Sequence, residues 1–351
     1  MESPVPNAVP RSPVRFLPRR WLRGAHAQTL AGNFLRRPKL LPPPEERLFE
    51  VEPGAQVLCH CHWQSERQKR FTILLVHGLE GSSQSHYVIG TGYKAWQRGW
   101  NVVRMNVRNC GGTEKLCPTL YNSGLSGDVR RVATALIEQD GLEAIGLAGF
   151  SMGGNQVLKC AGEWGAGAPR EVRAIAAVSP ACDLASSADR LHQPQNRMYE
   201  MWFLHGLFQR FRRKARLFPG QYDVELLRKV HSIRQFDDLI TARYMGFQSA
   251  DDYYAQASAA RFLDRIAIPA LVIHSSDDPF VVLRPETEAK LAANPNITYL
   301  RSEHGGHCAF LAAPDGYDGR WAEQQVIEFL AGDIEGTSEK ATTPPWRRTA
   351  K

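Results

Sequence analysis

Short apolar runs alternate with helical segments along most of this chain, and this alternation limits its fold more than any other feature. The clearest run, Phe71 to His77, is almost entirely apolar, as expected for a central strand covered on both faces. Strands that alternate with helices form a parallel, doubly wound sheet, so we predict an α/β fold. The predicted strands are 71–77, 101–106, 145–148, 172–178, 270–274 and 297–301, and the predicted helices 85–99, 128–139, 151–164, 284–293 and 321–331.

The alternation follows an N-terminal arm and is interrupted once. Residues 47–51 and 56–63 have the period-two pattern of two antiparallel strands joined through Pro53-Gly54. Residues 183–262 are helical and rich in aromatic residues and Arg, so we interpret them as an inserted helical cap. The predicted units are a basic arm (1–44), a core (45–182 and 263–333), the cap (183–262) and a disordered tail (334–351).

The positive charge of the chain is concentrated in the arm. With 351 residues, 43% hydrophobic and 23% charged, the chain has the composition of an ordinary globular protein. Its formal net charge is +7, and residues 1–44 alone hold eight basic residues against the single acid Glu2. Nothing else is typical of nucleic-acid binding, so we expect the arm to wrap its own domain. The apolar residues available for this packing are Trp21, Leu22, Leu30, Phe34 and Leu35.

The seven cysteines are scattered, without a CxxC pair, and indicate a reducing compartment rather than a disulfide framework. In Cys59-His60-Cys61-His62, strand alternation would place the Cys and His side chains on opposite faces, with two ligands each. We therefore predict no metal and no cofactor. The sequence shows no signal peptide and no run long enough to cross a bilayer, so we expect a cytoplasmic protein.

A serine between two glycines is the strongest candidate for a catalytic residue. Gly149-Phe150-Ser151-Met152-Gly153 follows the apolar run 145–148, an order that predicts a strand, a tight turn and a helix. The turn requires small neighbours because the serine adopts a strained conformation at its tip. A serine hydroxyl is a weak nucleophile at neutral pH, so this position indicates a nearby base and an oxyanion site.

Two acids and two histidines follow later strands of the same sheet. Asp277 and Asp278 come after the strand at 270–274, and His304 and His307 after the next one. The carboxyl ends of parallel strands meet at one edge, where a histidine could deprotonate the serine while an acid orients the imidazole. We favour His307 because a helix start follows it, and Asp278 as the acid, with His304 and Asp277 as the alternatives.

A glycine-rich loop follows the first central strand. His77-Gly78-Leu79-Glu80-Gly81 can present a backbone N–H group to an oxyanion, and Leu79 is the candidate donor. The second N–H would come from Met152, directly after the serine. The loop lacks the Lys-Ser/Thr pair of a Walker motif, so it is not expected to bind phosphate.

Motifs spread over residues 15–332 agree in order and spacing with a known family. They are His77-Gly78, Asn109-Cys110-Gly111-Gly112, the pentapeptide around Ser151, Asp278-Pro279 and His307, with His26-Ala27-Gln28-Thr29-Leu30, Phe236-Asp237-Asp238, Asp252-Tyr253-Tyr254 with Ser258, and Gly305 to Phe310. This set resembles the α/β-hydrolase superfamily, in its YheT-type branch with the ABHD1/ABHD3-like esterases and phospholipases. The segment 106–112 departs from the Arg-Gly-His-Gly pattern of the wider superfamily, and no hydrophobic anchor like that of eukaryotic relatives is expected.

The resemblance implies an α/β-hydrolase fold and serine carboxylester hydrolysis by Ser151, Asp278 and His307. We therefore predict an acyl-enzyme mechanism on short- to medium-chain acyl esters or lipids. The alternatives are an acyltransferase on the same fold and a non-catalytic binding protein, although no triad member is missing. The aromatic residues from Trp202 to Phe211 either bind an acyl chain or pack the cap against the sheet, and the cap's cations suit a peripheral membrane contact.

Overall fold

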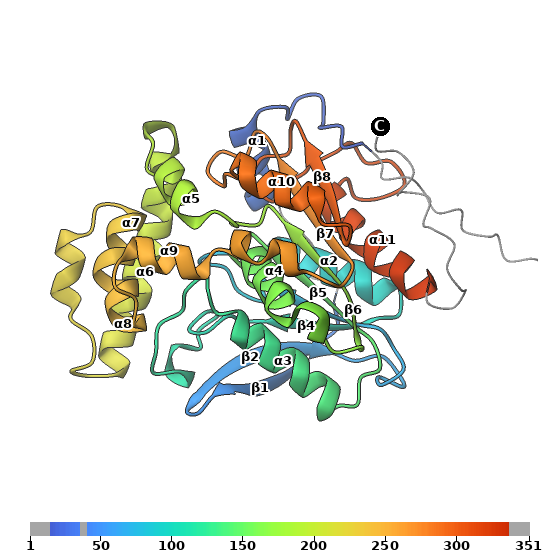
Figure 1. Ribbon diagram of the computed structural model, residues 1–351, viewed down its shortest axis with the longest axis horizontal. Helices are drawn as coiled ribbons and strands as arrows, with labels where there is room; N and C mark the ends of the chain where they lie inside the picture. The colour runs from blue at the N-terminus through green and yellow to red at the C-terminus, as the bar shows by residue number, and fades with distance from the viewer. Residues whose placement is uncertain (1–14, 36–40, 337–351) are drawn as a thin grey trace, which may run out of the picture.

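The computed structural model describes residues 15–35 and 41–336. The fold is built around one eight-stranded sheet (Figure 1). The strand order is β1-β2-β4-β3-β5-β6-β7-β8. β1, β2 and β4 pair antiparallel, and all the pairs from β4 to β8 are parallel. The strands are β1 (Glu45–Glu52), β2 (Ala55–His62), β3 (Thr72–Val76), β4 (Asn101–Met105), β5 (Ile145–Phe150), β6 (Val172–Val178), β7 (Ala270–Ser275) and β8 (Ile297–Ser302). The predicted α/β fold with a mostly parallel sheet is confirmed.

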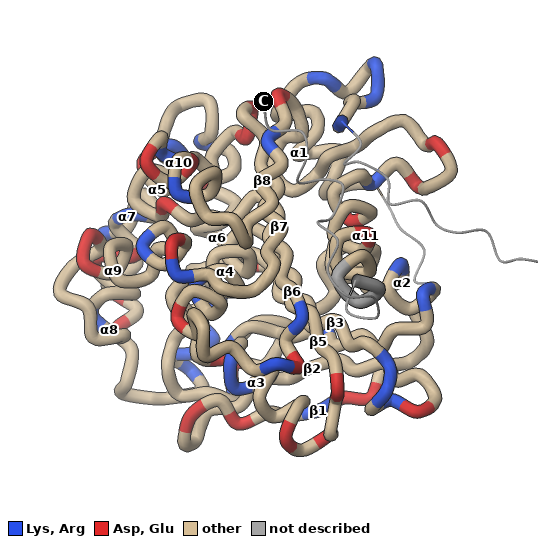
Figure 2. Tube along the Cα trace, turned by 45° about the vertical axis from the view of Figure 1, so that its right-hand side comes forward, with Lys and Arg blue, Asp and Glu red and all other residues tan. Residues whose placement is uncertain are grey.

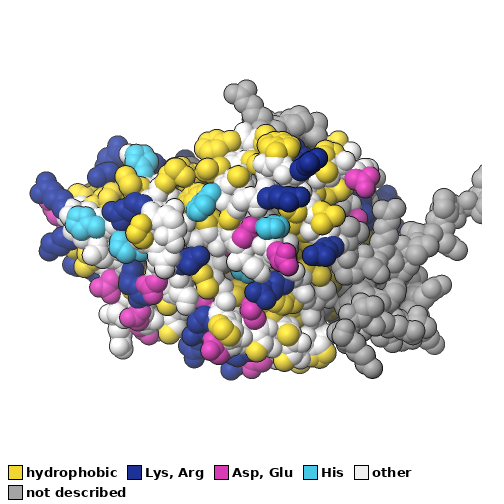
Figure 3. Space-filling view, turned by 90° about the horizontal axis from the view of Figure 1, so that it is seen from above, with side chains coloured by type: hydrophobic (Ala, Val, Ile, Leu, Met, Phe, Trp, Pro, Cys, Tyr) yellow, Lys and Arg dark blue, Asp and Glu magenta, His cyan; other side chains and the backbone are white. Residues whose placement is uncertain are grey.

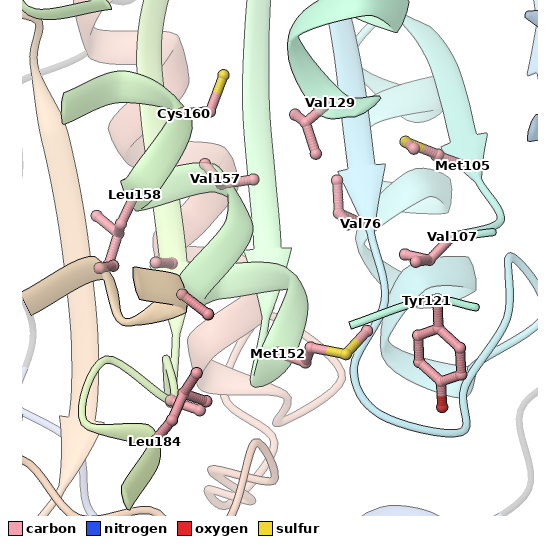
Figure 4. Packing of buried hydrophobic residues seen from close by; sticks show 14 of the residues in the cluster. Val76, Met105, Val107, Tyr121, Val129, Met152, Val157, Leu158, Cys160 and Leu184 are labelled. Carbon is pink, nitrogen blue, oxygen red and sulfur yellow. The ribbon is translucent and has the colours of Figure 1, made fainter. Parts of the chain in front are cut away.

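Helices cover both faces of the sheet, which explains why its central strands are apolar throughout. In β3, Leu74 and Val76 pack on one side, whereas Ile73 and Leu75 pack on the other. The first side is covered by α3 (Ser126–Glu138), α4 (Met152–Trp164) and α10 (Pro285–Ala293), and the second by α2 (His86–Gln97) and α11 (Trp321–Gly336). Figure 4 shows side chains of α3 and α4 packed with those of β3 and β4 on the first side.

A group of helices lies between β6 and β7, within the range predicted for the cap. Figure 1 shows α6 to α9 at the left, to one side of the sheet. These helices are α5 (Leu184–Leu191), α6 (Arg197–Leu217), α7 (Ile233–Phe236), α8 (Arg243–Met245) and α9 (Ala250–Ala257), with a π-helical segment η5 (Asp237–Ala242). Short 3-10 turns are η1 (Glu114–Leu116), η2 (Gly165–Gly167), η3 (Pro194–Asn196), η4 (Val224–Lys229), η6 (Ala259–Arg261) and η7 (Leu263–Arg265). We call residues 183–262 the cap. The limits of the domains stay a prediction.

The arm packs on the core through only part of its apolar set. Its helix α1 (Ala25–Phe34) follows the buried Leu22, and Leu30 packs against the core. Trp21 and Phe34 are 71% and 78% exposed, so the expectation that they pack on the domain is wrong. The remainder of the predicted arm and tail, residues 1–14, 36–40 and 337–351, lies outside the described residues.

Charged residues lie mainly on the outer helices and turns, around a sheet with few charges in its centre (Figure 2). Lys94 of α2, for example, pairs at the surface with Asp318 at 2.7 Å. In residues 15–35 and 41–336, no helix combines the length and the hydropathy that a membrane span requires.

Candidate active site

Ser151 lies at the tip of a tight turn between β5 and α4. Its backbone has φ 55° and ψ −119°, a region that non-glycine residues occupy only under strain. A Cβ on Gly149 would lie 2.2 Å from the Gly153 carbonyl oxygen, and one on Gly153 would lie 2.4 Å from that of Val76. Both flanking positions therefore require glycine, because the turn brings α4 directly against the strands. This is the strand–turn–helix geometry expected of an exposed nucleophile.

His307 and Asp278 form a hydrogen-bonded pair. His307 Nδ1 donates to Asp278 Oδ2 at 2.8 Å, while Asp278 Oδ1 accepts the backbone N–H groups of Phe280 and Val281 at 3.2 and 2.9 Å. Burial would raise the pKa of Asp278, but the charge and hydrogen bond of His307 outweigh it and lower that pKa. The same carboxylate raises the pKa of His307, although burial opposes the rise.

The two alternative residues pair with each other instead. His304 Nδ1 lies 3.5 Å from Asp277 Oδ2, and Asp277 Oδ1 accepts the Gly306 N–H at 2.9 Å. His304 is also the more exposed histidine, with 43% of its side chain accessible against 10% for His307. Asp277 thus holds the loop before His307 but is not bonded to that imidazole.

The serine turn and the His307 loop meet at the end of β6. The Val178 carbonyl accepts the Ser151 N–H at 2.9 Å, and Cys308 Sγ lies 3.6 Å from the same oxygen. Cys308 Sγ is also 3.7 Å from His307 Nε2, so this imidazole nitrogen lies on the side of the serine turn.

The predicted oxyanion loop passes beside the serine. A Cβ on Gly78 would lie 3.0 Å from Ser151 Cβ, and the Gly81 N–H donates to the Gly78 carbonyl to close a turn. Burial lowers the pKa of His77 to about 4, so its ring is neutral; Nδ1 donates to the Gly78 carbonyl at 2.7 Å. His77 Nε2 accepts the Val107 N–H at 3.0 Å, which ties this loop to the one after β4.

A pocket joins the serine turn to the cap. It has about 980 Å³ of unoccupied space, part of it open to solvent. The predicted donors Leu79 and Met152 both line it, as does Ser151. Met152 is the first residue of α4, and an N–H in the first turn has no partner within its own helix.

Cap aromatic residues divide between the pocket and the surface. Phe203 and Phe211 line the pocket, and Phe280, also in its wall, lies 4.4 Å from the His307 ring centroid. Trp202 is 61% exposed, so it neither lines the pocket nor packs the cap against the sheet.

A buried ion pair, missed by the sequence analysis, connects the loop of residues 77–81 to α6. Arg210 Nε and Nη2 donate to Glu80 at 3.0 and 3.1 Å, and the Tyr121 hydroxyl donates to Glu80 Oε1 at 2.6 Å. Glu80 has a positive φ of 56°, and a Cβ on Gly206 would lie 2.3 Å from Glu80 Oε2. A glycine within an otherwise bulky helix was the one available signal of this close approach.

Helix α1 forms the outer wall of the His307 loop. Thr29 Oγ1 accepts the His307 N–H at 2.9 Å, and Gln28 exchanges hydrogen bonds with the Leu311 backbone at 2.8 and 3.1 Å. A Cβ on Gly306 would lie 2.7 Å from Thr29 Oγ1. The arm therefore contacts the segment that carries the candidate base.

The site has no arrangement typical of a metal centre. All seven cysteines are free and buried. Within the described ranges, no three His, Cys, Asp or Glu side chains group together as ligands.

Comparisons with known proteins agree with this architecture. The profile of the alpha/beta hydrolase fold family matches residues 72–314. YheT of Escherichia coli (strain K12), whose name classes it with the esterases, is 33% identical over 93% of this chain and 96% of its own. Phospholipase ABHD3 of Mus musculus is 28% identical over 88% of this chain and 75% of its own.

Among solved structures, the Pyrococcus furiosus esterase Pf2001 has the same fold. It superposes with a TM-score of 0.54 at 14% identity, covering 85% of this chain and 98% of its own. The chain belongs to the α/β-hydrolase family, in the branch of YheT and ABHD3, which confirms the resemblance found in its motifs.

Proposed function

We propose that this protein is a serine carboxylester hydrolase with a triad of Ser151, His307 and Asp278. The observation that carries the proposal is the 2.8 Å hydrogen bond from His307 Nδ1 to Asp278, beside a serine in a strained nucleophile turn. A carboxylate in this position fixes the imidazole tautomer that leaves Nε2 free to take a proton. The esterase and lipase names of the relatives agree with this chemistry.

In the proposed reaction, Ser151 Oγ attacks the ester carbonyl as His307 Nε2 takes its proton. The N–H groups of Leu79 and Met152 stabilise the oxyanion of the tetrahedral intermediate. The imidazolium of His307 then protonates the departing alcohol, which leaves an acyl group on Ser151. Water, deprotonated by the same imidazole, releases the acid and restores the serine. Asp278 stabilises the imidazolium in both steps.

The pocket supports an acyl ester or lipid as the substrate. Its wall is mostly apolar and includes Leu207 and Phe211 of the cap together with Leu79 and Met152 of the core. Apolar walls with few polar groups favour a hydrocarbon chain. We propose short- to medium-chain acyl groups.

We propose that the enzyme is cytoplasmic and makes a peripheral contact with an anionic membrane. The exposed side of α6 supports this contact. Met198, Met201 and Trp202 are 58–61% exposed, and Arg212 follows on the same face. Figure 3 shows Lys, Arg and His side chains gathered on the left, where the cap lies. Trp202→Glu should lower cosedimentation with phosphatidylglycerol vesicles, whereas Leu48→Glu on the distant strand β1 should not. Equal loss in both variants would contradict this contact.

Ser151→Ala tests the proposed hydrolase directly. Turnover of p-nitrophenyl esters should fall to background while the circular dichroism spectrum and thermal midpoint stay unchanged. Ser123→Ala, which removes another hydroxyl from the pocket wall, serves as the control and should retain most activity. Retained turnover in Ser151→Ala would show that the nucleophile is another group.

The same assay separates the two alternatives. If added alcohols divert the acyl group from the acid to a new ester, the enzyme is an acyltransferase. A folded wild-type chain without turnover on any ester would favour a non-catalytic binding protein.

A further inference from the structure

One carboxyl group lines the wall of the pocket and forms no salt bridge within the described residues. Asp237 begins the π-helical segment η5, and it lines the pocket together with Thr241 and Tyr254. In residues 15–35 and 41–336, no Lys or Arg forms an ion pair with Asp237. The nearby Arg234 instead contacts Asp189, at 2.8 Å, and Asp251.

Asp237 is held by two hydroxyl groups and keeps further acceptor capacity. Thr241 Oγ1 donates to Oδ1 at 2.8 Å, and the Tyr254 hydroxyl donates to Oδ2 at 2.7 Å. A carboxylate has about four lone-pair sites, so each oxygen can accept a further hydrogen bond. Thr241 and Tyr254 are both buried, which fixes the carboxylate where it meets the pocket.

The apolar surroundings make the ionised form of Asp237 energetically unfavourable unless a further hydrogen-bond donor binds it. Burial raises the pKa of Asp237 to about 6, although the hydrogen bonds from Tyr254 and Thr241 and the nearby charge of Arg234 lower it, so the group is still mostly ionised at neutral pH. An ionised group in an apolar wall loses hydration that two hydroxyl donors replace only in part. π-Helical turns are rare and frequently mark functional sites, and this one sets Asp237 and Thr241 on the same side of the chain.

We propose that Asp237 is a polar subsite that binds a hydroxyl group carried on the acyl chain of the substrate. The inference rests on the proposed function, because the ester carbonyl must lie at Ser151 while the chain extends into the pocket. A hydroxyl fits better than an ammonium group, since it loses far less hydration on passing the apolar wall. The hydroxyl would donate to Asp237, and the substrate class is therefore hydroxylated medium-chain acyl esters.

A series of matched ester pairs tests this subsite. The probes are p-nitrophenyl esters of ω-hydroxy acids with 6, 8, 10 and 12 carbons, each compared with the unsubstituted ester of equal length. The measured quantity is the ratio of kcat/KM for the hydroxylated ester to that for the plain ester. This ratio is independent of how much of a variant is folded, because both esters are assayed on one preparation.

In the wild type the ratio should peak at the chain length that reaches Asp237. In Asp237→Asn this peak in the ratio should fall by roughly tenfold or more, as expected for loss of a charged acceptor. Asp238→Asn is the matched control, since Asp238 accepts the Ala250 N–H and does not line the pocket. Equal ratios in the wild type and Asp237→Asn at every length would overturn the subsite.

Failure of the proposed function gives a different result. If the wild type hydrolyses no ester, calorimetry with 8-hydroxyoctanoate, 12-hydroxydodecanoate and the plain acids still measures the subsite. Tighter binding of a hydroxy acid that is lost in Asp237→Asn supports the subsite, and equal affinities of all pairs contradict it.

Discussion

Thr29 provides a sharp test of how the candidate base is positioned. Its hydroxyl is the acceptor for the His307 N–H at 2.9 Å, and it donates to the Ala25 carbonyl at 2.8 Å. Thr29 is 2% exposed, so water cannot easily replace it. Thr29→Val has nearly the same shape but cannot accept this hydrogen bond.

The expected magnitude follows from the unsatisfied N–H group. Leaving a buried donor without a partner costs about 1–3 kcal/mol, and the His307 loop can avoid this cost only by moving. If this cost of about 1–3 kcal/mol reduces the population of the loop conformation in which His307 is correctly placed, kcat falls by roughly 5- to 150-fold. KM should change little, because Thr29 does not line the pocket.

The assay is steady-state ester hydrolysis together with the rate of Ser151 labelling by a fluorophosphonate. Thr29→Ser keeps the acceptor and should restore most of both rates. Thr91→Val is the matched control, since Thr91 is fully buried and its hydroxyl has no hydrogen-bond partner in the described structure. A folded Thr29→Val enzyme with kcat within twofold of the wild type would refute this positioning role.

Three further predictions concern the acid, the base and the cap. Asp278→Asn should lower kcat by about 10³–10⁴-fold, whereas Asp277→Asn should retain most activity; the reverse order would make Asp277 the triad acid. Because Asp278 raises the pKa of His307, kcat/KM should decline as pH falls, with a midpoint above the ordinary imidazole pKa of 6.5. Asp278→Asn should move that midpoint to lower pH. A wild-type midpoint at or below pH 6.5 would contradict the effect of Asp278 on the pKa of His307. Arg210→Met should destabilise the fold by about 3–5 kcal/mol in urea unfolding, because it leaves Glu80 buried without its cation, and adding Glu80→Gln should recover part of that loss; strictly additive losses would show that the pair is not coupled.

Local sequence signals were sufficient for the sheet and for the serine turn. The strand of residues 72–76 is covered on both faces, so its apolar run is continuous, and the glycines beside Ser151 are required by close backbone contacts. Both signals lie within a few residues of the structure that they predict.

Contacts between distant segments could not be predicted in the same way. Asp277 and Asp278 are adjacent, and only the turn after β7 decides which one meets His307. Glu80 and Arg210 lie 130 residues apart, and Gly206 indicates a close approach to the helix without indicating that Glu80 makes it. Trp202 has the spacing of a packed residue, yet it lies on the outer face of a cap helix whose other face lines the pocket.

We propose that Ser151 is a nucleophile activated by His307. Intact mass and peptide mapping after fluorophosphonate treatment measure it most directly. We expect one adduct, on the peptide that contains Ser151; it should be absent in Ser151→Ala and form at least about 10³-fold more slowly in His307→Ala. An adduct on another residue, or unchanged labelling in His307→Ala, would contradict it.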